Sequence, residues 1–107
     1  MQTLGKQDPY VEFKYNGEKF KTAVHEDGDT APAWDDEFTF FLEALWHEIK
    51  FTVRDEEVFG SRKIGQVVVK ASSLCFNNGV REWFTITYKD KYAGKLLIET
   101  KFKPVEA

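Results

Sequence analysis

A stretch in the middle of the chain, residues 55–63, combines three kinds of side chain that could act on a ligand. Asp55-Glu56-Glu57 are acidic, Val58-Phe59 are apolar, and Arg62-Lys63 are basic. Carboxylate oxygens are the ligands that calcium prefers. An apolar tip rimmed by cations can insert into a membrane whose head groups are anionic. The stretch therefore indicates a binding site, provided that the Phe59 side chain projects outward and does not fold back onto the core.

Catalytic motifs do not accompany this stretch. The sequence contains no Ser-His-Asp motif, Walker sequence or glycine-rich phosphate loop. His25 and His47 lack a cysteine or histidine at zinc spacing. Asp27-Gly28-Asp29 begins like an EF-hand loop, but Pro32 takes the place of the required glycine. We therefore expect a protein that is not an enzyme.

Length and composition are typical of one small globular domain. The 107 residues, expected to form a single domain over 1–107, are 16% aromatic and include ten Phe. The single cysteine, Cys75, excludes an intrachain disulfide and fits a reducing compartment. A net charge of -3 argues against nucleic-acid binding. With no secretory signal and no long apolar run, we expect a cytoplasmic protein in which any contact with a membrane is local and peripheral.

The elements that must position the site have the patterns of β-strands. Residues 9–15 alternate between apolar and polar side chains, and Asn16-Gly17 is typical of a two-residue type I′ turn. Folding 18–25 back about this turn sets Phe13 opposite Phe20 and Lys14 opposite Lys19. A short helical turn is expected at 42–46, and further strands at 37–42, 48–54, 65–71, 82–88 and 95–102. The glycine-containing segments Phe59-Gly60-Ser61, Asn77-Asn78-Gly79 and Ala93-Gly94 also predict turns. Seven short strands without intervening helices predict an all-β fold, an antiparallel sandwich.

Three segments resemble the C2 domain family of calcium- and phospholipid-binding β-sandwiches. They are Asp8-Pro9-Tyr10-Val11, the run from Pro32 to Phe38 that contains Trp34-Asp35-Asp36, and Val53 to Glu57 followed by Ile64-Gly65. Their order is that of the family over nearly the whole chain. A narrower similarity, on residues 5–11 and 94–96, is to small stand-alone members such as the plant elicitor-responsive and phloem types.

The resemblance implies calcium ligands at one end of the sandwich. The matching positions hold Asp8, Asp55 and Glu57, whereas Gln2 and either Arg62 or Lys63 stand where the family has acids. A cation there repels calcium and lies within reach of an ion pair with Asp55 or Asp8. We therefore expect calcium to bind weakly or to be dispensable.

The resemblance also implies how a membrane would be contacted. The apolar and basic residues of the two neighbouring loops would dock to anionic phospholipid: Leu4, Lys6, Val58, Phe59, Arg62 and Lys63. A second surface, a candidate phosphoinositide face, consists of Lys14, Lys19 and Lys21 on the outside of the first hairpin. A solvated face with no ligand is the competing interpretation of these three lysines, because Glu12 offsets part of their charge.

One strand of the family is not found in the sequence. The family places a strand before the loop that leads into Asp8-Pro9, where residues 1–7 already have loop character. Two explanations stay open: the chain is a truncated product, or another strand, such as one from a partner chain, fills the gap. An unfilled gap would expose a sheet edge, which invites pairing with another chain. Protein–protein interaction or self-association through an unpaired edge is therefore the alternative function.

Overall fold

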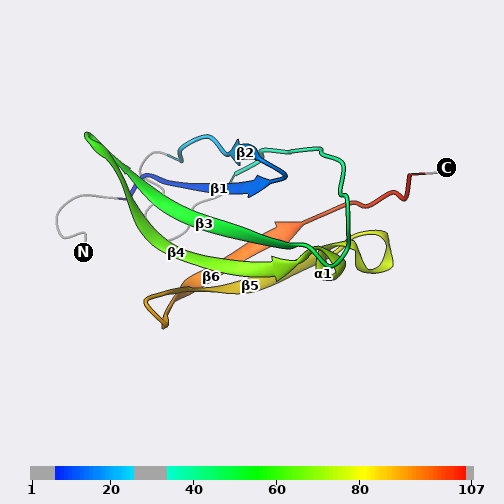
Figure 1. The fold of residues 1–107 in the computed structure, drawn as a ribbon. Coiled ribbons are helices and arrows are strands. Elements are labelled where there is room, and N and C mark those ends of the chain that lie inside the picture. The colour runs from blue at the N-terminus through cyan, green and yellow to red at the C-terminus, as the bar shows by residue number, and fades with distance from the viewer. Residues whose placement is uncertain (1–6, 26–33, 106–107) are drawn as a thin grey trace.

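The computed structural model describes residues 7–25 and 34–105, which form six strands and two short helical segments (Figure 1). In chain order these are β1 Pro9–Tyr15, β2 Glu18–Lys21, β3 Glu48–Glu57, β4 Gly60–Lys70, α1 Ala71–Cys75, the 3₁₀ turn η1 Phe76–Asn78, β5 Arg81–Tyr88 and β6 Lys91–Glu99. Within these residues, no helix has the length and apolar character needed to cross a bilayer.

The first hairpin confirms the predicted turn and register. Asn16 and Gly17 have φ angles of 51° and 82°, as a type I′ turn requires. The pairs Phe13–Phe20 and Lys14–Lys19 lie opposite each other. The two Phe rings stack with their centroids 4.9 Å apart and are packed, partly buried, against the core.

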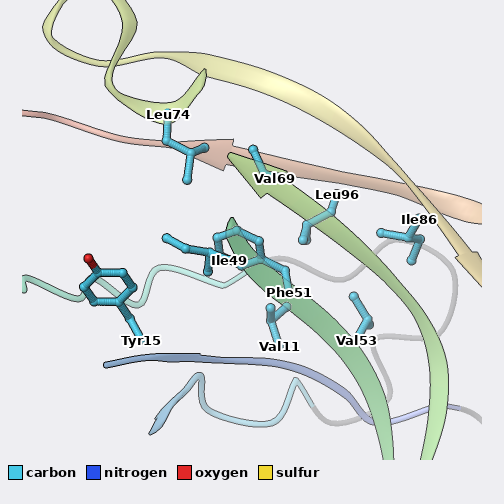
Figure 2. Packing of buried hydrophobic residues seen from close by; sticks show 9 residues of the cluster. All are labelled: Val11, Tyr15, Ile49, Phe51, Val53, Val69, Leu74, Ile86 and Leu96. Carbon is cyan, nitrogen blue, oxygen red and sulfur yellow. The ribbon is translucent and has the colours of Figure 1, made fainter. Parts of the chain in front are cut away.

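All strands pair antiparallel in the order β2-β1-β3-β4-β5-β6, which confirms the predicted fold class. β4 and β5 are paired at Gln66 and Thr87, near one end, so the β5–β6 hairpin can fold over the preceding strands. Figure 2 shows Leu96 of β6 and Ile86 of β5 directed toward Phe51 and Val53 of β3. The hydrophobic core therefore lies between the two parts of the sheet, as in a sandwich.

The strand predicted at 37–42 is wrong, because this segment pairs with no strand among the described residues. Its side chains nevertheless alternate between the core and the surface. Phe38 and Phe40 contact the Phe13 ring at centroid distances of 5.7 and 5.8 Å, while Phe41 is exposed. This alternation is typical of a strand, but a strand also needs a neighbour with which it exchanges backbone hydrogen bonds.

The structure places two of the predicted turns, Phe59-Gly60-Ser61 and Ala93-Gly94, elsewhere. β3 and β4 form one long hairpin with the tight turn Val58-Phe59, so residues 55–57 and 60–63 belong to strands and not to an open loop. The last hairpin turns at Lys89-Asp90, where φ is 51° and 65°, and Ala93-Gly94 lie inside β6. The turn at Asn77-Asn78-Gly79 is confirmed, and a turn at Leu45-Trp46 falls within the predicted helical turn.

The tryptophans divide into one core residue and two surface residues. Trp34 packs against the core, as expected, and its indole N–H donates to the carbonyl oxygen of Pro9 over 3.1 Å. The sequence favours core or strand-packing positions for all three tryptophans. This expectation is wrong for Trp46, which is 74% exposed and lies in no strand. Trp83 is not in the core, being 64% exposed, but it lies on β5 opposite Leu97. Cys75 is partly buried at the end of α1, and burial raises the pKa of its thiol.

Candidate functional site

The register of the β3–β4 hairpin brings an acid and a base together at one end of the molecule. Asp55 lies directly opposite Arg62. Directly opposed side chains of an antiparallel pair share one face and lie within contact distance. Arg62 Nη2 donates to Asp55 Oδ2 over 3.1 Å, and Arg62 Nε lies 3.9 Å from Glu57 Oε2. The expected ion pair of a cation with Asp55 is therefore confirmed.

Asp55 also holds the entry to β1. Its Oδ1 accepts a hydrogen bond of 2.9 Å from the backbone N–H of Asp8, while Asp8 accepts one of 3.0 Å from the N–H of Glu56. Asp55 is only 7% exposed and stands on the same face of β3 as the core residue Val53. A carboxylate this deeply buried needs its partners, so Asp55 here has a structural role in joining three segments.

The turn beyond this ion pair carries the most exposed large apolar side chains of the described chain. Val58 is 90% exposed and Phe59 95% exposed. The turn projects away from α1, at the far end of the β3–β4 hairpin (Figure 1). Phe59 does not fold back onto the core. Leu4 and Lys6, predicted to adjoin this tip, lie outside the described residues.

Lys63, the second basic residue of the predicted contact, faces away from Asp55. It lies opposite Arg54 and donates from Nζ to the side-chain oxygen of Gln66 over 2.8 Å. This partner is neutral, and no carboxylate of residues 7–25 or 34–105 lies within ion-pair distance of Lys63. Arg62 and Lys63 thus differ in their roles: the charge of Arg62 is neutralised within the hairpin, whereas that of Lys63 is available to a ligand.

The three lysines of the first hairpin differ in their intramolecular partners. Lys19 forms an ion pair with Glu12 at 3.3 Å, and the Lys21 ammonium lies 4.4 Å from the centroid of the Tyr10 ring. Among the described residues, no carboxylate lies within ion-pair distance of Lys14. Lys14 is therefore the member of this face with the most available charge.

Glu12 is the centre of a charge cluster that the sequence did not predict in full. Besides Lys19, it accepts a hydrogen bond of 2.8 Å from Arg54 Nε. Burial opposes ionisation of Glu12, but the hydrogen bonds from Arg54 and Lys19 outweigh it and lower the pKa of Glu12 below its usual value of 4.5. Finding Arg54 would have required the β1–β3 register, for which the sequence has no turn signal.

The acids do not form a metal site as they are arranged. Among residues 7–25 and 34–105, no three His, Cys, Asp or Glu side chains gather in a group that could hold a metal ion. The Arg62 guanidinium occupies the space between Asp55 and Glu57 that a cation would need. The residues present therefore do not fit calcium while this ion pair is formed.

Comparison with known proteins defines the class. The sequence model of the C2 domain matches residues 1–86, so the chain belongs to the C2 domain family. It is 31% identical to Synaptotagmin-4 of Arabidopsis thaliana over 104 residues, which cover 94% of this chain and 18% of that protein. It is 35% identical over 77 residues to the 16 kDa phloem protein 1 of the same plant, covering 66% of this chain and 49% of that one.

Solved structures share the fold. A C2 domain-containing protein from a putative elicitor-responsive gene superposes with a TM-score of 0.82 over 96% of this chain and 77% of its own, at 22% identity. A C2 domain of plant Extended Synaptotagmin 1 superposes with a TM-score of 0.74 over 97% of this chain and 86% of its own, at 26% identity. The chain spans less than a fifth of Synaptotagmin-4 and about half of the phloem protein.

Proposed function

We propose that this C2 domain docks to anionic phospholipid membranes through the β3–β4 turn and does so without calcium. The observation that carries the proposal is the exposure of Val58 and Phe59 on a turn just beyond the Asp55–Arg62 ion pair. A metal ion that neutralises acids near a membrane removes their repulsion from the anionic surface. Arg62 neutralises Asp55 permanently, so calcium is not needed to remove the repulsion between this acid and the anionic surface.

The energetics favour modest, salt-sensitive binding. Burying the Phe59 side chain contributes about 1.5–3 kcal/mol. Each basic residue near an anionic surface, here Lys63 and Lys6, adds about 1 kcal/mol. Glu56 and Glu57 are exposed on the same hairpin and oppose this attraction. The domain would associate peripherally with a membrane from the cytoplasm and would act as a binding module, as C2 domains typically do, and not as an enzyme.

A second contact is assigned to the Lys14, Lys19 and Lys21 face, with phosphoinositide as the ligand. Lys14 would contribute most, because Lys19 and Lys21 already have intramolecular partners. Adding a phosphoinositide to the vesicles should then increase binding, and Lys14→Ala should remove that increase without affecting binding to phosphatidylserine.

Co-sedimentation with vesicles tests the main proposal. Vesicles of phosphatidylcholine with phosphatidylserine should bind the chain equally well in chelator and in millimolar calcium, and less well as salt is raised. Pure phosphatidylcholine vesicles are the control. Binding only with calcium would show that Arg62 is displaced by the metal. No binding in either condition would favour the alternative, a calcium-independent protein–protein interaction module on the same fold.

A further inference from the structure

The two edges of the sheet differ in how well they are protected against another chain. β2, at one edge, has only four residues, two of them lysines. Short strands and lysines both discourage edge pairing. β6, at the other edge, has nine residues and carries three consecutive apolar residues, Leu96-Leu97-Ile98. Consecutive apolar residues are typical of strands that are covered on both faces.

The hydrogen bonds that follow β6 show which of its backbone groups point toward β5 and which point away from it. The N–H groups of Thr100 and Phe102 donate to the carbonyl oxygens of Val80 and Asn78, on the β5 side. Successive residues of an extended chain direct their backbone groups to opposite sides. Leu96 and Ile98 therefore face β5 in the same phase as Thr100. The N–H and C=O groups of three residues point away from β5, to the side on which no described strand pairs with β6: Lys95, Leu97 and Glu99.

We propose that a second copy of this chain covers this edge, with the two β6 strands pairing antiparallel about a two-fold axis at Leu97. Leu97 then lies opposite Leu97 of the second copy. Lys95 of each copy lies opposite Glu99 of the other, so opposite charges meet twice. The same register pairs all three outward-facing residues through their backbone groups. Sequence pattern, charge and hydrogen-bonding phase thus agree on one arrangement.

Other registers of the β6–β6 pair place like charges opposite each other or lose the two charge pairs. Centring the axis on Lys95 or on Glu99 sets like charges opposite each other, which destabilises an antiparallel pair. Centring it on Leu96 sets Lys95 opposite Leu97 and forfeits both charge pairs. With the axis at Leu97, the apolar contact continues across both copies, because Leu97 lies opposite the exposed Trp83 on β5 of its own chain. This inference does not depend on membrane docking.

A charge swap tests the register by sedimentation equilibrium. The wild-type chain should show a concentration-dependent monomer–dimer equilibrium. Lys95→Glu and Glu99→Lys should each raise the dimer dissociation constant about tenfold. The two variants mixed, or both substitutions in one chain, should restore dimerisation. Arg81→Ala controls for the loss of the exposed Arg81–Glu99 pair and should have no effect. A chain that stays monomeric up to about 500 µM would overturn the proposal.

Cross-linking tests the position of the axis. In a Cys75→Ser background, Leu97→Cys places two thiols on directly opposed residues, about 5.5 Å apart between Cα atoms, which is within disulfide range. Oxidation should give a covalent dimer. Thr85→Cys, one strand further from the axis, should not cross-link. A dimer that resists both the charge substitutions and the Leu97→Cys cross-link would show that another surface forms the interface.

Discussion

The Arg62 guanidinium lies 3.1 Å from the Asp55 carboxylate, whose other oxygen accepts the backbone N–H of Asp8. One arginine therefore balances the charge of the buried acid that ties β3 to the start of β1. The pair holds the end of the hairpin and reduces the negative charge behind the Val58-Phe59 turn.

Removing the arginine should destabilise the fold. Arg62→Ala removes the guanidinium donor from the buried Asp55 carboxylate, which keeps the hydrogen bond from the Asp8 N–H. The substitution should lower the free energy of unfolding by about 1–3 kcal/mol. Chemical denaturation measures this loss. Arg81→Ala is the matched control, because its ion pair with Glu99 is long, at 3.9 Å, with side chains 68% and 65% exposed, and should change stability by less than about 0.5 kcal/mol. Equal losses for the two variants would contradict a structural role for the Asp55–Arg62 pair.

The Glu12 cluster predicts an acid-sensitive contribution to stability. Because the folded pKa of Glu12 lies below its usual value of 4.5, the contribution is fully present above pH 4.5 and is lost as the pH falls through the folded pKa. Glu12→Gln should cost about 1 kcal/mol at neutral pH and progressively less as the pH falls below 4.5 and through the folded pKa. Denaturant midpoints across this acid range give the comparison; a cost that does not depend on pH would rule out a role for the Glu12 charge.

Phe13 joins segments that are far apart in sequence. Its ring lies 4.9 Å from that of Phe20, 5.0 Å from Phe51 and 5.8 Å from Phe40. Phe13→Ala should therefore lower the free energy of unfolding by about 3 kcal/mol. Phe76→Ala, at a ring that is 73% exposed, is the control and should have little effect. A small loss for Phe13→Ala would mean that residues 37–42 do not depend on this aromatic cluster.

Features that a local sequence signal specifies could be predicted, whereas features that depend on contacts between distant segments could not. Asn16-Gly17 predicted its hairpin completely, because turn type and apolar alternation both specify the same register. Val58-Phe59 and Lys89-Asp90 have none of the glycine or asparagine that marks a tight turn, so these hairpins were misplaced. The pattern at 37–42 is typical of a strand, but among the described residues no partner strand lies beside it.

For the candidate site, the sequence predicted one ion pair. An acid at 55 and a base at 62 or 63 predict it without knowledge of the strand register, and Asp55 and Arg62 do lie opposite each other. The bond from Asp8 N–H to Asp55 and that from Arg54 to Glu12 join strands distant in sequence. Such contacts depend on the β1–β3 register, which no turn encodes.

The apolar turn should dominate the affinity for vesicles at every ionic strength. Phe59→Ala should weaken binding to phosphatidylserine-containing vesicles about 10- to 100-fold. Phe76→Ala is again the matched control, since Phe76 is exposed at the opposite end of β4. Undiminished binding of Phe59→Ala would move the docking surface to the lysine face or elsewhere.

The basic residues should matter chiefly at low salt. Lys63→Ala should weaken vesicle binding about fivefold at low ionic strength and much less when salt screens the charges. Adding Arg62→Ala should weaken binding further, because it also restores the repulsion between Asp55 and the anionic surface. A loss that is equal at low and high salt would show that these residues act through folding.

Insertion depth of a spin label at residue 59 tests the central claim most directly. In a Cys75→Ser background, Phe59→Cys and Asn77→Cys place the label on the β3–β4 turn and at the opposite end of the molecule. With phosphatidylserine-containing vesicles in chelator, the label at 59 should become accessible to oxygen and shielded from a polar relaxation agent, and the label at 77 should remain in water. A label at 59 that stays in water while the chain is vesicle-bound would contradict docking through this turn.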